Sequence, residues 1–202
     1  MKVLQDAKLI GTGVQRYCYE DPDDESKCIK VSIKSTRAND LEERYFTFLQ
    51  SRGISWSNLT RFYSKEKTDM GDGLVFDLVR DFDGEVSKSI DYYIQNEDAY
   101  MLIKDFKRDF LDLKEYMFKN GVIAKDLSQF NVLYQRVSKD SGRFIIIDGL
   151  GNPEAIPVSN YIKFFQKRRI TKYWDKFFRR VKKVSTSNEL FHQMIREIEQ
   201  ES

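Results

Sequence analysis

Residues 122–135 read Val-Ile-Ala-Lys-Asp-Leu-Ser-Gln-Phe-Asn-Val-Leu-Tyr-Gln, and residues 144–149 read Phe-Ile-Ile-Ile-Asp-Gly. Within them are two apolar runs of strand character, Val132–Tyr134 and Phe144–Ile147, separated by a polar turn that contains Ser, Asp and Gly. Two short apolar runs around such a turn are typical of a β-hairpin. The stretch therefore predicts an antiparallel pair of strands in the second half of the chain.

Polar residues lie at the start of the first predicted strand and at the end of the second. In an antiparallel pair these two ends are neighbours. Asp126 comes five positions before Asn131, which opens the first strand, and Asp148 closes the second. Carboxylate and amide oxygens suit Mg²⁺, and a spare acid can accept a proton from a hydroxyl. We interpret Asn131 and Asp148 as metal ligands and Asp126 as a catalytic base, in the order of the protein-kinase-like fold. Taken alone, an ordinary hairpin with acids at its ends fits equally well.

The N-terminal segment favours the kinase-like interpretation. Residues 9–19 hold Gly11 and Gly13 between an apolar lead-in and an alternating run, and two such glycines let backbone N–H groups approach a phosphate. Lys30 follows inside an apolar strand, where a lysine is costly unless it is paired. We expect the two glycines and Lys30 to bind the phosphates of ATP, although a simple turn and a strand lysine with its head in water are the plain alternatives.

A helix is predicted over residues 39–49. On one face of it Glu42 accompanies three apolar residues, Tyr45, Phe46 and Leu49. A carboxylate on a buried face needs a cation, so we expect Glu42 to hold Lys30, as in kinases. Glu43 takes this role if the helix is rotated.

The middle of the chain predicts a strand that ends in an acidic turn. Residues 73–79 are mostly apolar and lead into Asp81 and Asp83. In a kinase this is the hinge, where backbone groups of Asp77–Val79 bind adenine and Asp81 or Asp83 meets the ribose. A buried strand and a solvated turn explain the same residues.

One long amphipathic helix is then expected over residues 97–120, with Asn120-Gly121 as its stop. The order of these predicted strands, helices and motifs along the chain indicates an α+β, protein-kinase-like fold. We expect two lobes within one domain, residues 1–202. A small N-terminal antiparallel sheet with one helix occupies 1–80, and a reduced, mainly helical lobe occupies 81–202.

The chain resembles the YrbL family, small bacterial proteins of the PhoP regulatory network with a kinase-like fold. The residues that carry the resemblance are Leu9–Gly13, Asp21–Asp24, Cys28–Lys30, Tyr63–Thr68, Val75–Gly84, Leu127–Leu133 and Asp148–Gly151. The resemblance implies a cytoplasmic bacterial protein whose substrate is poorly defined.

Several departures from the kinase pattern narrow the expected substrate. Ala124-Lys125-Asp126 lacks the usual histidine, and Ser128 stands where many protein kinases carry a lysine. Only 54 residues follow Asp148, without an activation segment. We therefore expect a sugar, lipid or small-molecule acceptor rather than a protein.

Composition excludes other classes. The 202-residue chain has 41% hydrophobic and 33% charged residues, no run of 18 apolar residues and no apolar N-terminal leader. We expect a cytoplasmic protein in which Cys18 and Cys28 are reduced and pack on neighbouring strands. His192 is the only histidine, which argues against a His-ligated metal and a Ser-His triad.

Charge is unevenly distributed. Residues 163–183 hold ten Lys or Arg and one acid, on a chain whose net charge is +2. Six aromatic residues are interleaved, and helical spacing predicts aromatics on one face and bases on another. Three interpretations of this segment stay open, in order of preference. The first is a packing helix with a solvated basic face. The second is a site for an anionic substrate or membrane surface, and the third is a nucleic-acid site.

Two functions follow. The first is an ATP- and Mg²⁺-dependent phosphotransferase. The alternative is a pseudokinase, a nucleotide-binding or adaptor module in a bacterial regulatory network. The set Lys30, Asp126, Asn131 and Asp148 favours the first, because a module without catalytic demand could have lost it.

Overall fold

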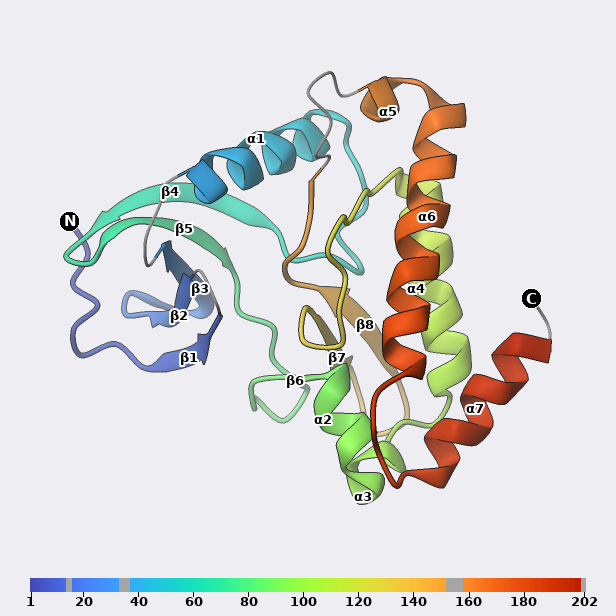
Figure 1. The fold of residues 1–202 in the computed structure, drawn as a ribbon. Coiled ribbons are helices and arrows are strands. Elements are labelled where there is room, and N and C mark those ends of the chain that lie inside the picture. Colours follow the sequence, from blue (N-terminus) through green and yellow to red (C-terminus); the bar gives the residue numbers. More distant parts are fainter. Residues whose placement is uncertain (14–15, 33–36, 152–157, 201–202) are drawn as a thin grey trace. The chain divides into compact units, whose positions relative to one another are not determined.

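A computed structural model describes residues 1–13, 16–32, 37–151 and 158–200 (Figure 1). It confirms the predicted mixture of helices and antiparallel sheet. The chain divides into two compact units: residues 1–56 with 60–79, and residues 57–59 with 80–202. Each unit has its own sheet and core, so each is described by itself.

The first unit contains a five-stranded antiparallel sheet in the order β1-β2-β3-β5-β4. Its strands are β1 (Leu9–Thr12), β2 (Arg16–Asp21), β3 (Asp24–Ser32), β4 (Phe62–Thr68) and β5 (Gly71–Asp77). Cys18 and Cys28 lie on neighbouring strands, as predicted, and both are free thiols. A hydrogen bond with the Cys18 thiol and burial raise the pKa of Cys28 well above its usual value. Cys28 is buried among the core side chains, as the predicted packing role requires.

One helix, α1 (Arg37–Ser51), completes this unit. Its buried face carries Phe46, which packs edge-on against Phe76 of β5 with ring centroids 5.0 Å apart and also contacts Phe62 of β4 at 6.1 Å. Glu42 and Leu49 are buried on the same face. The predicted spacing of α1 is confirmed, including the burial of a carboxylate among apolar side chains.

The second unit contains the predicted hairpin. Strands β7 (Val132–Arg136) and β8 (Gly142–Ile146) pair antiparallel, and β6 (Lys88–Ser89) adds a short third strand beside β7. The segment 57–59 joins this unit because Asn58 donates from Nδ2 to the Phe144 carbonyl oxygen at 3.0 Å.

Helices supply the rest of the second unit. They are α2 (Ile90–Gln95), α3 (Glu97–Tyr100), α4 (Phe106–Asn120), α5 (Val158–Tyr161), α6 (Lys163–Lys182) and α7 (Glu189–Gln200). The single helix predicted over 97–120 is wrong, because residues 101–105 interrupt it. The Asp105 carboxylate accepts a hydrogen bond from the Arg108 N–H at 2.9 Å and so starts a new helix. The predicted stop is confirmed, since Gly121 follows α4 with a φ of 65°.

Aromatic packing holds α4, β8 and α6 together. The ring of Phe110 lies 4.9 Å from Trp174, 5.6 Å from Phe177 and 6.1 Å from Phe144, measured between centroids. In Figure 1, α4 and α6 lie side by side over most of their length. The aromatic face predicted for α6 is therefore confirmed for its middle and C-terminal part.

The prediction is wrong for the first turn of α6. Phe164 and Phe165 are 68% and 44% exposed, although they belong to the same aromatic pattern. No helix of the described ranges is long and apolar enough to cross a membrane.

Candidate functional site

Two segments of the second unit lie side by side at the predicted catalytic loop. The Asp126 N–H donates to the Gly149 carbonyl oxygen at 3.0 Å, and the Gly151 N–H donates to the Ile123 carbonyl oxygen at 3.1 Å. A parallel bridge between Ala124 and Gly151 continues the contact. The loop that follows α4 is therefore fixed to the segment that leaves β8.

Asn131 ties both segments to the hairpin. Its side-chain Nδ2 donates to the Asp126 carbonyl oxygen at 3.0 Å, while its carbonyl oxygen accepts from the Ile147 N–H at 2.9 Å. The structure thus brings the positions of Asp126, Asn131 and Asp148 together, as the antiparallel arrangement predicts. The roles assigned to them remain predictions.

Gly149 is required by this close approach. Its φ is +79°, and a Cβ atom at this position would lie 2.4 Å from the Asp126 carbonyl oxygen. Any other residue would collide with the loop and adopt an unfavourable backbone conformation. The glycine of Asp148-Gly149 therefore has a packing reason, and its N–H donates to Asp148 Oδ1 at 2.6 Å.

The oxygen atoms here fit a Mg²⁺ ion of the kind that binds with nucleotide phosphates. Asn131 Oδ1 accepts no hydrogen bond from the described residues, since the amide is oriented by its Nδ2 bond. Together with the Asp148 carboxylate it offers two oxygen ligands, and Mg²⁺ commonly takes one or two protein ligands and completes its shell with phosphate and water. Within the described ranges no group of three or more His, Cys, Asp or Glu forms a metal cluster.

Arg180 of α6 contacts the predicted base, which the sequence analysis did not foresee. Its Nη1 donates to Asp126 Oδ1 at 2.8 Å and to the Leu127 carbonyl oxygen at 2.9 Å. The Asp126 side chain is nevertheless 60% exposed, and Oδ2 accepts no hydrogen bond from the described residues. A carboxylate held at one oxygen and open at the other can still receive a proton. The sequence does signal that residues 163–183 carry excess positive charge. It does not show that Arg180 pairs with Asp126, because the two residues are 54 positions apart.

The acidic turn after β5 is held by other cations. Asp81 is buried, and it accepts from the Arg136 N–H at 3.0 Å, from Arg136 Nε at 2.7 Å and from Ser87 Oγ at 2.5 Å. The side-chain hydrogen bonds to Asp81 and, to a smaller extent, to Asp83 raise the pKa of Arg136. Asp81 thus stabilises the turn. A ribose could bind the Asp81 carboxylate only by replacing its hydrogen bonds with Arg136 and Ser87. Asp83 also pairs with Arg136.

In the first unit, the two glycines lie on β1 and in the turn after it. Gly11 pairs with Cys18, and a Cβ atom at Gly11 would meet no atom within 4 Å. The Gly13 N–H donates to the Arg16 carbonyl oxygen at 2.8 Å and closes the hairpin, whose residues 14–15 lie outside the described residues. A side chain at position 11 would therefore contact no other atom of the structure within 4 Å, and phosphate binding at Gly11 stays a prediction.

Lys30 occupies the middle of β3 and is buried. Its Nζ lies over the ring of Phe76, 4.4 Å from the centroid. A cation over an aromatic face is partly compensated for its lost hydration. The predicted burial of Lys30 is therefore observed, with Phe76 as one of its contacts.

Arg16 is the cation that the structure gives to Glu42. Arg16 Nη1 donates to Glu42 Oε2, and the second oxygen, Oε1, is buried without a hydrogen-bond partner among the described residues. Of the two alternatives, Glu42 is buried and Glu43 is only partly so. The sequence predicts Lys30 as the partner of this glutamate, and the structure adds Arg16, which stands where a third glycine would stand in the kinase loop.

At the predicted hinge, the Asp77 side chain serves the fold. It accepts from the Arg61 N–H and from the Tyr63 hydroxyl, both at 2.7 Å. The second bond raises the pKa of Tyr63 to about 12. The Val79 side chain is buried, and its N–H donates to no acceptor among the described residues. Binding of adenine at the Val79 backbone stays a prediction.

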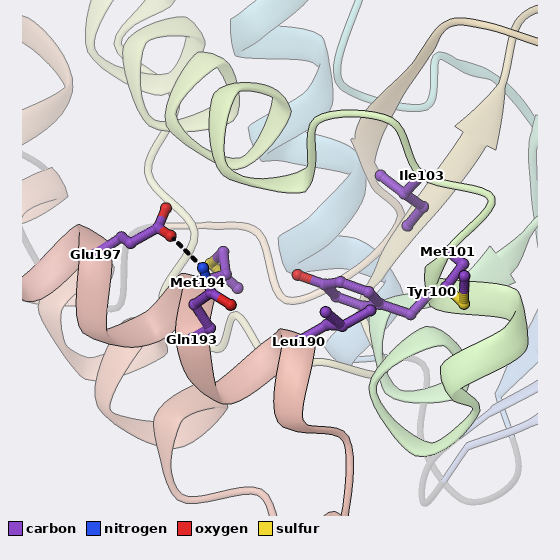
Figure 2. A pocket seen from close by; sticks show the side chains of 7 residues that line it. All are labelled: Tyr100, Met101, Ile103, Leu190, Gln193, Met194 and Glu197. Atoms are coloured by element: carbon purple, nitrogen blue, oxygen red, sulfur yellow. Dashed lines mark hydrogen bonds between the residues drawn. The ribbon is translucent and has the colours of Figure 1, made fainter.

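An apolar hollow in the second unit stands apart from these residues. Figure 2 shows its side chains, which come from Tyr100 at the end of α3, from the segment after α3 and from α7, and which enclose about 350 Å³. Its only acid, Glu197, accepts from Gln193 Nε2 at 3.1 Å. None of the predicted catalytic or nucleotide-binding residues lines it, so it is not part of the candidate site.

Comparisons with known proteins point to one family. The model of the PhoP regulatory network protein YrbL family matches residues 3–182. Two relatives named "Uncharacterized protein YrbL", from Escherichia coli (strain K12) and Shigella flexneri, are each 28% identical over 178 residues. The match covers 86% of this chain and 85% of each relative.

Proposed function

The chain belongs to the PhoP regulatory network protein YrbL family, and we propose that it is an ATP- and Mg²⁺-dependent phosphotransferase with a non-protein acceptor. The observation that carries the proposal is the convergence of Asp126, Asn131 and Asp148-Gly149 through four backbone and side-chain hydrogen bonds. A base beside two oxygen ligands is what transfer of a phosphoryl group to a hydroxyl requires.

A protein-kinase-like fold is part of the proposal. A five-stranded antiparallel sheet with one helix precedes a long helix and a hairpin that bears the acids, which is the order of such folds. Ala124, where many protein kinases carry a histidine, and Ser128, where many carry a lysine, depart from the protein-kinase pattern, and these departures favour a sugar, lipid or small-molecule acceptor.

In the second unit the residues would divide the chemistry between them. Asp126 Oδ2 would accept the proton of the acceptor hydroxyl. Asn131 and Asp148 would hold Mg²⁺, which supplies charge neutralisation at the phosphates when bound. Arg180 would add the positive charge that Ser128 does not provide, because its Nη2 and Nε donate to none of the described residues.

The first unit would bind the nucleotide. The open backbone at Gly11 and the turn at Gly13 suit phosphate oxygens, and buried Lys30 would contact them. The Val79 N–H is a donor for adenine, whereas the Asp77 and Asp81 carboxylates are already occupied. Asp77 therefore contributes through its backbone only.

ATP with Mg²⁺ is expected to stabilise the folded chain against heat. A ligand at a hundred times its dissociation constant adds about 2.7 kcal/mol to the free energy of unfolding. Asp148→Asn should remove most of the Mg²⁺-dependent part of this stabilisation, because the amide is a weaker metal ligand. The measurement is the melting temperature with ATP, with and without Mg²⁺.

Asp175→Asn is the matched control. It removes the same charge from an exposed position on α6 and should leave the shift unchanged. If the wild-type chain shows no shift at millimolar ATP, the nucleotide assignment fails.

A pseudokinase is the second candidate, and the ion pair between Arg180 and Asp126 favours it. An arginine on the base can hold the loop in a form that binds nucleotide without turnover. A melting shift with ATP and Mg²⁺, together with no detectable ATP turnover by the wild type or by Arg180→Ala, would select this alternative.

A further inference from the structure

The junction of α5 and α6 exposes a continuous set of large apolar side chains. Tyr161, Ile162, Phe164 and Phe165 are 73%, 47%, 68% and 44% exposed. Single exposed apolar residues are ordinary, but four within five consecutive positions, two of them with ring centroids 5.5 Å apart, are typical of an interaction surface. We call these four side chains the apolar tip.

Cations surround the apolar tip. Residues 163–172 include five Lys or Arg and no acid. A hollow of about 330 Å³ lies beside the tip and is lined by Ser159, Phe165, Arg168, Arg169 and Lys172. Phe165 belongs to both the hollow and the tip, so the apolar and the cationic features form one surface.

Four of the five cations of this surface have no ionic partner in the part of the chain that the structure describes. Arg168 and Lys172 form no ion pair with any described residue, and neither do Lys163 and Lys167. The cations that do pair, Arg180 and Lys182, lie at the other end of α6, with Asp126 and Glu199 as partners. Unpaired positive charge is therefore concentrated where the apolar tip is exposed.

We propose that the junction of α5 and α6 is a docking surface for an anionic phospholipid bilayer. The apolar tip would enter the interfacial region, where aromatic rings are favoured. The cationic hollow would receive a lipid phosphate, to which arginine binds with paired hydrogen bonds, and the neighbouring lysines would be attracted by the anionic leaflet.

Charge complementarity and side-chain type select this occupant. A second copy of the chain would bring the same cations to the interface and repel, whereas an anionic bilayer attracts them. RNA also suits basic and aromatic residues, but Ile162 offers no ring for a base to stack on. A bilayer accepts aliphatic and aromatic side chains alike. The surface lies apart from the phosphotransfer residues, so the proposal does not depend on them.

The experiment is co-sedimentation of the full chain with vesicles. One set contains phosphatidylcholine alone and the other phosphatidylcholine with phosphatidylglycerol. We expect binding to the second set only. Binding should weaken steeply as ionic strength rises from about 0.01 M to about 1 M, because the screening length falls from about 30 Å to about 3 Å.

Two double substitutions test the two halves of the surface. Phe164→Ser with Phe165→Ser should lower affinity about tenfold or more at every salt concentration, because apolar area is lost. Arg168→Glu with Lys172→Glu should lower it by a similar factor at low salt and remove most of the salt dependence. All four side chains are exposed, so urea unfolding should be nearly unchanged.

Matched controls lie elsewhere in the second unit. Met101→Ser with Leu102→Ser removes two apolar side chains that are 66% and 58% exposed, and Lys139→Glu reverses one exposed charge. Both should bind vesicles like the wild type, and so should Asp148→Asn. The last control separates this proposal from the proposed catalysis.

Three outcomes would overturn the proposal. The first is equal binding to both vesicle sets. The second is loss of binding in the controls as well as in the test variants. The third is tighter binding of a single-stranded RNA than of anionic vesicles, abolished by the same substitutions, which would assign the surface to nucleic acid.

Discussion

Asp126→Asn is expected to lower phosphotransfer on the order of a hundredfold or more while leaving ATP binding nearly intact. General-base assistance contributes about this much to a proton transfer in the transition state. Asparagine has the shape of aspartate, and its Oδ1 can still accept from Arg180, so the loop should keep its hydrogen bonds. The measurement is Mg²⁺-dependent ATP turnover, with water or an identified acceptor, alongside the dissociation constant of ATP.

Lys30→Met provides the contrast for this prediction. Lys30 is proposed to contact the phosphates in the ground state and in the transition state, so its loss should weaken both binding and turnover. Asp126 would be a structural residue if Asp126→Asn reduced ATP binding as much as turnover. Unchanged turnover in Asp126→Asn would remove the base assignment.

Phe177→Ala is expected to lower the free energy of unfolding of the second unit by about 3–5 kcal/mol, the usual range for a buried Phe replaced by Ala. Phe177 is fully buried and packs against Phe110 of α4, with ring centroids 5.6 Å apart. Its replacement leaves a cavity between α4 and α6. Urea unfolding followed by circular dichroism measures the change.

Phe164→Ala is the matched control in the same helix. The side chain is 68% exposed, so its removal should change the free energy of unfolding by less than about 0.5 kcal/mol. Similar losses for the two variants would mean that Phe164 is covered in solution, and the docking surface proposed for the apolar tip would then be lost with it.

Local patterns were sufficient for much of the architecture. The two apolar runs and the polar turn between residues 132 and 147 predict β7 and β8, because antiparallel neighbours close in sequence pair directly. The same geometry predicts that Asp126, Asn131 and Asp148 meet. The face of α1 was also predictable, since helical spacing alone places Glu42 with buried Phe46.

Local competition explains the error in the helix predicted over residues 97–120. Apolar spacing continues through residues 101–105, but the Asp105 side chain bonds to the Arg108 N–H and begins α4 anew. Met101 and Leu102 are left exposed. Apolar periodicity predicts which residues share one face of a helix. It does not predict where a side chain competes with the helix for a backbone donor.

The choice of ionic partners needed the tertiary structure. Arg16 reaches Glu42 across 26 positions, and Arg180 reaches Asp126 across 54. Ten cations in residues 163–183 carry the same charge, and only the packing of α6 beside the loop selects Arg180. Asp21 pairs with Lys2 and Asp81 with Arg136, and periodicity along the chain indicates neither of these ion pairs.

Membership of the YrbL family, the α+β composition, the hairpin and the group of polar residues at its ends are all predictable from the amino-acid order. They follow from short-range periodicity and from motifs along the chain. The burial of Phe177, the exposure of Phe164 and the hydrogen bond from Arg180 to Asp126 depend on how distant elements pack. Burial and ion pairing depend on which distant element lies opposite a residue, and the same helical pattern permits either result.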